Sequence, residues 1–264
     1  MQYDEQTLKN IAEKYAEVGR IYDQLALRLS SMVSSLRNAR AKEYLTQGVG
    51  RRLSILNRCI RNIFGIFPVG RTEHLAPEEL ADLDINLHAF FINVSGILDN
   101  LGWVFVFEND LLVGSSQEGK LGKEDIGLFK KKTQSCLPEK LLKYLNTEHI
   151  KKWYDEYSKN YRDALAHRIP LYVPPFVLNK EEQEKSLALE NQIHALDLSV
   201  HGNFAIYDQL RKKQKELGQA SSLFIHSFDE ASQPMPLHAQ VLIDYVTVEE
   251  IFNSFCENMR TKLP

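Results

Sequence analysis

The strongest constraint on the fold of this chain is an apolar repeat near its N-terminus. Residues 4–46 contain no proline and a single glycine, Gly19. Apolar side chains recur there in steps that alternate between three and four: Leu8, Ile11, Tyr15, Val18, Tyr22, Leu25, Leu29, Met32 and Leu36. This 3.5-residue repeat predicts one long helix with a narrow apolar seam. The seam has to pack lengthwise against another helix, either in the same chain or in a partner protein.

A second helix is expected to follow closely. The QGVG segment at 47–50 breaks the repeat, and the apolar spacing resumes over 53–67. Because Pro68 cannot continue a helix, the second helix should end before it. Residues 1–70 then form either an antiparallel hairpin of two helices or one long helix that is kinked near Gly48.

A third helix is predicted over 77–109, and it should lie at the centre of the fold because it is apolar around most of its circumference. Its polar residues follow a pattern. Asn86, Asn93 and Asn100 recur every seven residues, and Asp99 adjoins the last of them. Since buried amides need hydrogen-bond partners, this polar stripe is predicted to face polar groups.

The remaining elements are expected to be shorter. A loop is expected over 113–136, followed by a helix over 138–145 and a helix from an N-cap at Thr147 to about His167. A helical stretch over 180–217 comes next and is weakest around His201–Gly202. Two β-strands are expected over 223–228 and 238–246, and a final helix runs through Met259 after a capping box of Thr247 and Glu250. The predicted fold is therefore all-α. It is a helical bundle in one compact unit over 1–264, with a helical hairpin (1–70), a helical core (77–217) and a minor C-terminal β-hairpin plus helix (218–264).

The composition and the N-terminus indicate a soluble protein of the cytoplasm. The three cysteines, Cys59, Cys136 and Cys256, are odd in number and far apart, as expected in a reducing compartment. The N-terminus lacks the basic and apolar regions of a signal peptide. The most apolar segment, 85–107, is interrupted by Asp99, so it is interpreted as a buried helix and no membrane contact is expected.

Positive charge gathers near the front of the chain. Residues 37–61 hold seven cations against one acid, Glu43, whereas residues 180–264 hold eight cations against thirteen acids. Such asymmetry can mark a surface that faces a polyanion, and Arg51, Arg52 and Arg58 are the candidates for contact with a nucleic-acid backbone. The alternative is an ordinary solvated helix face.

One short motif could carry chemistry. Arg162 is followed by Asp163 and, five residues after the arginine, by His167. Arginine suits a phosphate because its charge is permanent and its donors form a planar fork, and histidine suits proton transfer near neutral pH. Residues five apart on a helix differ by roughly 140° around the axis, so a second copy of the motif would help to bring the two functions together. The alternative is a structural Arg–Asp arrangement at a helix end, with the histidine favoured there by the helix dipole.

The surroundings of this motif resemble the HEPN superfamily. These all-helical proteins carry Arg, four to six residues and His near the end of one helix, with a polar residue directly after the arginine; here the matching residues are Arg162, Asp163 and His167. The resemblance covers the 85–109 and 147–170 helices. Many members are metal-independent ribonucleases of the toxin, defence or RNA-processing type, commonly dimers in which both motifs line one cleft, and others have lost activity and only bind RNA or nucleotides; the resemblance implies one of these two roles. Arg162 would hold the scissile phosphate, His167 would be the general acid or base, and Asp163 would orient one of them.

Two functions follow as hypotheses. The first is an endoribonuclease that cuts RNA by attack of the 2′-hydroxyl and needs neither metal nor other cofactor, with Asp99 and Asn100 of the polar stripe as supporting residues and a homodimer as the active form. The second is a non-enzymatic helical interaction or RNA-binding module, in which the 8–36 seam dimerises the protein or docks a protein partner and the Arg162–His167 motif is structural.

Overall fold

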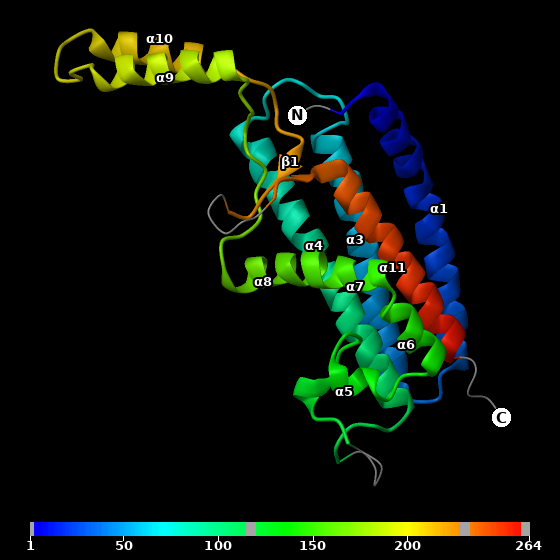
Figure 1. Ribbon diagram of the computed structural model, residues 1–264. Helices are drawn as coiled ribbons and strands as arrows, with labels where there is room; N and C mark the ends of the chain where they lie inside the picture. Colours follow the sequence, from blue (N-terminus) through cyan, green and yellow to red (C-terminus); the bar gives the residue numbers. More distant parts are fainter. Residues whose placement is uncertain (1–2, 115–119, 228–232, 260–264) are drawn as a thin grey trace.

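A computed structural model describes residues 3–114, 120–227 and 233–259, and there the fold is all-α with one minor sheet, as predicted (Figure 1). The helical elements are α1 (Glu5–Ser35), α2 (Ala39–Glu43), η1 (Tyr44–Gly50), α3 (Arg51–Ile66), α4 (Pro77–Glu108), η2 (Lys123–Asp125), α5 (Lys131–Gln134), α6 (Glu139–Leu145), α7 (Glu148–Lys152), η3 (Trp153–Ser158), α8 (Lys159–His167), α9 (Lys180–His194), α10 (Asn203–Lys215) and α11 (Leu237–Met259). The two strands are β1 (Leu223–Phe224) and β2 (Met235–Pro236). The elements η1 and η3 are π-helical turns that join the flanking α-helices without a gap.

The central helix is α4, as the sequence predicts. It packs against α3, η1 and α2 on one side and against α8 and α11 on others. In the part of the chain that the structure describes, α4 is also the one helix long and apolar enough to cross a membrane, but 61% of its most apolar window is buried inside the fold. That degree of burial is typical of the core helix of a soluble protein.

The first helix is shorter than predicted, and the turn lies elsewhere. Helix α1 ends at Ser35, and the chain turns over residues 36–38. Glu108, at the end of α4, holds this turn by accepting hydrogen bonds from the backbone N–H groups of Arg37 and Asn38 at 2.9 and 3.0 Å. The expected break at 47–50 is instead a π-helical turn that leads directly into α3. Of the predicted 1–70 unit, the described residues 3–70 therefore form an antiparallel hairpin, one of the two predicted arrangements.

The apolar seam of α1 is buried within the same chain. Val18, Leu25 and Met32 are almost fully buried, and α1 packs lengthwise against α11 and also touches α3 and η1 (Figure 1). Within the chain, α11 covers this face of α1, so a protein partner along the 8–36 seam stays a prediction and would have to pack beside α11.

The C-terminal prediction is correct for the hairpin but wrong for its second strand. Among the described residues, which leave out 228–232, Leu223–Phe224 and Met235–Pro236 are the segments that pair as strands, while residues 238–246 belong to α11. The capping box is wrong as well, because Thr247 lies inside α11 and its hydroxyl donates to the carbonyl of Ile243. Thr147 does occupy an N-cap position, at the start of α7, but its hydroxyl donates to the carbonyl of Tyr144 instead of capping the helix.

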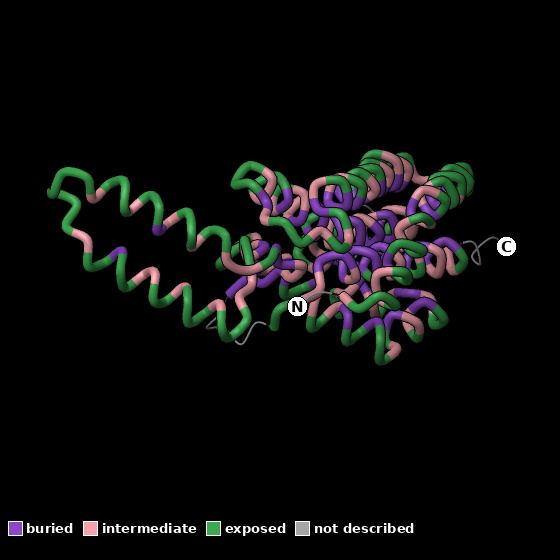
Figure 2. The backbone as a smooth tube through the Cα atoms, turned by 90° about the horizontal axis from the view of Figure 1, so that it is seen from above, coloured by how far each residue is buried: buried purple, intermediate pink, exposed green. Residues whose placement is uncertain are grey.

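Helices α9 and α10 project from the bundle as an antiparallel arm (Figures 1 and 2). The helical prediction for 180–217 and its weak point at His201–Gly202 are confirmed, because residues 195–202 connect the two helices. Inside the arm only Ile193 and Leu210 are buried. Its base is joined to the body where the backbones of Val177 and Gln219 pair. Of the predicted 113–136 loop, residues 115–119 lie outside the described residues.

Candidate functional site

The helical run from α7 through η3 to α8 carries the predicted motif and crosses α4 (Figure 1). Trp153 anchors this run, since its indole N–H donates to Oδ1 of Asp244 in α11 at 2.7 Å. The Tyr161 ring lies against Phe91 of α4, with ring centroids 4.7 Å apart. These two buried contacts position the next residue, Arg162, beside α4.

Arg162 and Asp99 meet at a small cavity between α4 and α8. Its volume is about 10 Å³, and its lining residues are Ser95, Leu98, Asp99, Phe129, Tyr154, Lys159 and Arg162. The Phe129 and Tyr154 rings stack at 3.9 Å and close one side. A space of this size holds about one water molecule, so a larger ligand could contact only its outer rim.

Asp99 is surrounded by positive charge. Burial by the neighbouring protein raises the pKa of its carboxyl, although part of the side chain remains exposed. Arg162, Lys130 and Arg52 oppose this rise and favour the ionised form, in that order of strength. These three cations come from α8, the loop before α5, and α3. We call Asp99, Arg162, Lys130, Arg52 and Lys159 the Asp99 recess; it holds four cations and one carboxylate.

Arg52 reaches the recess because a glycine makes room for it. Its Nη1 donates to Oδ1 of Asn93 in α4 at 2.9 Å. Its guanidinium lies directly over Gly96, where an added Cβ would be only 2.4 Å from the Arg52 Cζ. Any other residue at position 96 would have to displace the guanidinium from the surface of α4.

A groove between α3 and α4 adjoins the recess on the Arg52 side. It has a volume of about 500 Å³, and its lining residues are Arg40, Glu43, Tyr44, Gln47, Gly48, Arg51, Arg52, Ile55, Asn93 and Asn100. We call it the α3–α4 groove. Arg52 lines the groove and also favours the ionised form of Asp99, so this side chain links the groove to the Asp99 recess.

Two residues of the polar stripe of α4, Asn86 and Asn93, face polar groups as predicted. Asn86 accepts a hydrogen bond from Asn62 of α3 at 2.9 Å, and Asn93 accepts the one from Arg52. Asn100 lies against Gly48 in η1, where an added Cβ would be 2.6 Å from its Nδ2. Asn100 therefore lines the groove and, unlike Asp99, is not part of the recess.

The motif residues are only partly brought together. Arg162 forms an ion pair with its neighbour Asp163, Nε to Oδ1 at 3.1 Å, and both side chains are partly exposed. Such an exposed pair contributes little to stability. It matches the structural Arg–Asp alternative and leaves the outer edge of the guanidinium in reach of a ligand.

His167 is the last residue of α8 and is exposed. Within the described ranges, no hydrogen bond or ion pair joins its ring to another residue. Because α8 is regular between Arg162 and His167, the two side chains point to faces roughly 140° apart. One copy of the chain therefore does not place the imidazole beside the guanidinium.

Of the three arginines of α3 that the sequence predicts as site residues, two line the site and one does not. Arg51 is exposed and lines the groove, and Arg52 joins groove and recess. Arg58 is exposed and lines neither. Lys130 and Lys159 are site residues that sequence reasoning missed. Lys159 could have been found, because it lies three residues before Arg162 and therefore on the same side of the helix.

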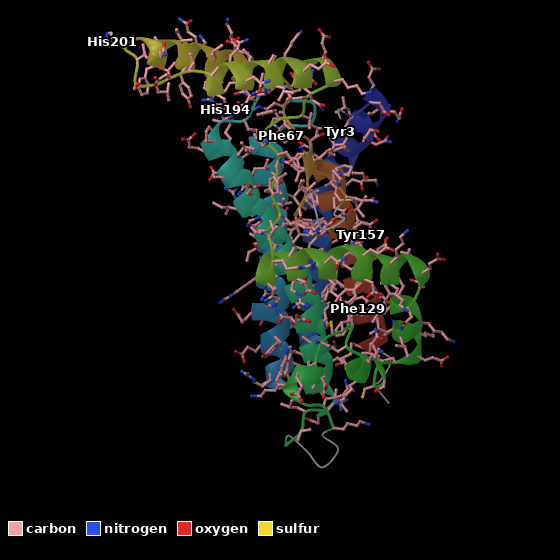
Figure 3. All side chains as sticks on the ribbon, turned by 60° about the vertical axis from the view of Figure 1, so that its left-hand side comes forward. Tyr3, Phe67, Phe129, Tyr157, His194 and His201 are labelled. Atoms are coloured by element: carbon pink, nitrogen blue, oxygen red, sulfur yellow. The ribbon has the colours of Figure 1, made fainter. Side chains whose placement is uncertain are left out.

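Histidines elsewhere do not add to this site. Figure 3 shows His194 and His201 on the projecting arm, away from Phe129 and Tyr157 near the recess. Among the residues that the structure describes, no group of three or more His, Cys, Asp or Glu side chains could hold a metal ion. No protein-family model, curated protein or solved structure matches the chain.

Proposed function

We propose that this is a cytoplasmic protein that binds RNA by its phosphate backbone at the Asp99 recess and the α3–α4 groove. The observation that carries the proposal is that two arginines from distant parts of the sequence lie on the same stretch of α4: Arg162 lines a cavity with Asp99, and the Arg52 guanidinium lies over Gly96, three residues before Asp99. Lys130 and Lys159 add to this charge. The four cations outnumber the two carboxylates near them, Asp99 and the Asp163 that pairs with Arg162, and such a surplus favours a ligand with repeated negative charges.

The types of cation fit phosphate. Two of the recess cations are arginines, whose planar forks donate two parallel hydrogen bonds to phosphate oxygens. Asn93 fixes the Arg52 side chain through one nitrogen, which leaves its other donors for a ligand. When no RNA is bound, Asp99 would offset the repulsion among the cations. When RNA binds, its phosphate would interact with the same cations.

The second candidate is a metal-independent endoribonuclease of the HEPN type, favoured by the exposed position of His167 at the end of α8. Its imidazole would remove the proton from a 2′-hydroxyl or deliver one to the leaving 5′-oxygen. Arg162 would offset the charge that builds on the phosphorane. Asp163, four residues before His167 and on the same helix face, would orient the ring.

This second candidate requires a homodimer. Because Arg162 and His167 lie on different faces of α8, the His167 of one protomer would have to approach the Arg162 of the other. The dimer would form through a surface that includes α8, since both residues lie on that helix. Light scattering at tens of micromolar protein tests it, and a strict monomer argues for RNA binding without cleavage.

The binding proposal is tested by fluorescence anisotropy with a labelled RNA over a range of salt concentrations. Arg52→Ala and Arg162→Ala should each weaken binding and flatten the salt dependence, because each removes roughly one phosphate contact. Arg20→Ala, an exposed arginine on α1, is the matched control for loss of one charge. Equal effects of all three substitutions would show that the recess has no special role.

The cleavage candidate is tested with the same RNA in the presence of EDTA. Cleavage should persist, give 2′,3′-cyclic phosphate ends, and stop when the 2′-hydroxyl at the cut site is replaced by hydrogen. His167→Ala should lose cleavage but keep binding. If wild-type protein binds RNA and leaves it intact with and without metal ions, the enzyme candidate is wrong and the RNA-binding module remains.

A further inference from the structure

The α3–α4 groove has the size and shape of a small-ligand site. Its volume of about 500 Å³, lined by residues of α2, η1, α3 and α4, is within the range of roughly 300–1,000 Å³ for ligand pockets. The Asp99 recess, by contrast, leaves room for about one water molecule. If a phosphate chain lies along Arg52, the groove is the neighbouring space that could take a larger group attached to that chain.

The π-helical turn η1 shapes one wall of the groove. It adds a residue to the turn and carries Gln47 and Gly48 at the groove wall. Gly48 lets the Asn100 amide lie directly against the backbone of η1, since a Cβ would come within 2.6 Å of Nδ2. Turns of this kind occur frequently at functional sites. Here the turn brings two amide side chains, Gln47 and Asn100, to the same groove.

These two amides have hydrogen-bonding groups to spare. Gln47 is exposed and Asn100 is half-buried. In the described part of the chain, neither side chain is hydrogen-bonded to another residue. Each carries both donors and an acceptor, which is the complement needed by the edge of a nucleobase.

An aromatic cluster borders the groove at Tyr44. The Tyr44 ring lies 5.5 Å from Trp103 and 5.2 Å from Phe107, and all three side chains are partly exposed. The Arg40 guanidinium carbon lies 5.6 Å from the centre of the Tyr44 ring. Aromatic rings and stacked guanidinium groups are the surfaces on which proteins hold unpaired bases.

The charge of the groove fits one nucleotide. Arg40, Arg51 and Arg52 line it against a single acid, Glu43. Glu43 is paired with Arg40 at 2.6 Å, and both are exposed. Arg51 and Arg52 are therefore left for a phosphate, on the side of the groove next to the recess.

We infer that the α3–α4 groove holds one unpaired nucleotide, and that the RNA bound by this protein is single-stranded. Its phosphate lies on Arg51 and Arg52, its base stacks on Tyr44 or on the Arg40 guanidinium, and its edge bonds to Asn100 and Gln47. The inference rests on the proposed RNA binding and adds the class of RNA. A duplex could satisfy the cations, but its stacked and paired bases could not enter the groove.

The test compares three probes by competition in fluorescence anisotropy: a single-stranded RNA, a duplex of the same length, and a mononucleotide. Single-stranded RNA should bind at least ten-fold more tightly than the duplex at equal salt. Tyr44→Leu should weaken single-strand binding by roughly five- to hundred-fold, as expected for the loss of one stacked base, while Tyr44→Phe keeps the ring and binds like wild type. Circular dichroism verifies that both variants fold.

A second pair of variants does not disturb the aromatic cluster. Asn100→Ala and Gln47→Ala should weaken single-strand binding but leave its salt dependence unchanged, because they remove no charge. Equal binding of duplex and single strand, with no effect of these variants, overturns the inference and leaves the backbone proposal standing. Failure of every RNA to bind overturns both. A mononucleotide that competes as well as the single strand makes the ligand a free nucleotide and also overturns the inference.

Discussion

At the scale of single residues, the most unusual group outside the site is Asp244. It is fully buried in α11, and its Oδ1 accepts hydrogen bonds from Trp153 and from Gln240 at 2.7 and 2.8 Å. Its second oxygen has no partner among the described residues. Burial raises the pKa of this carboxyl to about 7, and the two hydrogen bonds only partly offset the shift. The fold therefore favours the protonated form.

This predicts the sign of a pH effect. In the unfolded chain the pKa of the Asp244 carboxyl is about 3.9, which is lower than in the folded protein. Its contribution to the unfolding free energy is therefore fully present below about pH 4 and is lost as the pH rises through about 7. Asp244→Asn removes this titration and keeps an acceptor for Trp153. The difference in unfolding free energy, variant minus wild type, should therefore be more positive at pH 8 than at pH 4, by on the order of 3 kcal/mol. Urea denaturation at both pH values checks this, and a pH-independent difference would contradict it.

His238 should act in the opposite direction. Its buried ring donates from Nε2 to the carbonyl of Phe67 at 2.6 Å, and burial lowers the pKa of the imidazole to about 4. The unfolded chain takes up a proton near pH 6.5, so stability is lost as the pH falls from about 6.5 to about 4. His238→Gln should be less stable at pH 7 and should lose less stability over that acid range. Parallel pH profiles for variant and wild type would show that His238 does not contribute.

The site residues could be predicted from the sequence one by one, but their arrangement in space could not. Arg52, Asp99 and Arg162 are each recognisable in the sequence by charge or by an unusual position in an apolar helix. Their convergence is not recognisable, because it depends on Gly96 allowing Arg52 onto α4 and on how α8 crosses that helix. Lys130 is missed for the same reason, since it lies in a loop whose path the sequence does not define.

At the scale of elements, helical periodicity predicted which segments are helices, but it did not predict where the helices begin and end. The three-and-four spacing of α1 continues through Leu36, so it cannot reveal a turn at 36–38. That turn depends on Glu108, which is distant in sequence. In α11 the β-branched residues of 238–246 were misleading, because the segment is buried on more than one side and even its polar pair at helical spacing, Gln240 and Asp244, is buried instead of marking a solvent-facing side.

Glu108 provides a prediction at this scale. Glu108→Ala removes the acceptor for two backbone N–H groups at the turn between α1 and α2, and the unfolding free energy should fall by about 1–3 kcal/mol. Glu13→Ala, an exposed acid in the middle of α1, is the control and should change it by less than about 0.5 kcal/mol. Urea denaturation of the two variants measures both values. Similar stabilities would mean that the turn does not depend on this carboxylate.

At the scale of the whole molecule, the all-α bundle follows from the sequence, but the projecting arm does not. The 180–217 stretch is recognisably helical, yet nothing in its pattern indicates that it leaves the body. The physical reason is visible in the structure: few of its side chains are buried, and those that are buried lie between α9 and α10 (Figure 2).

The arm should therefore be dispensable for folding. The backbones of Val177 and Gln219 pair at its base, so a short Gly–Ser linker can replace residues 180–215 without separating the ends. The shortened chain should unfold cooperatively, with a melting temperature within a few degrees of wild type, since the arm adds no side chain to the main core. Differential scanning calorimetry measures this, and loss of the cooperative transition would mean that the arm supports the body.

The central claim is that Arg52 and Arg162 act together on one phosphate chain at Asp99, and a double-mutant cycle on RNA affinity tests it most directly. Arg52→Ala, Arg162→Ala and the double variant are compared with wild type at one salt concentration. The account predicts that the single substitutions each weaken binding and that the double variant loses less than their sum, with a coupling of roughly 0.5–3 kcal/mol, as for residues that share one partner. Strictly additive losses, or wild-type affinity in the double variant, would contradict it.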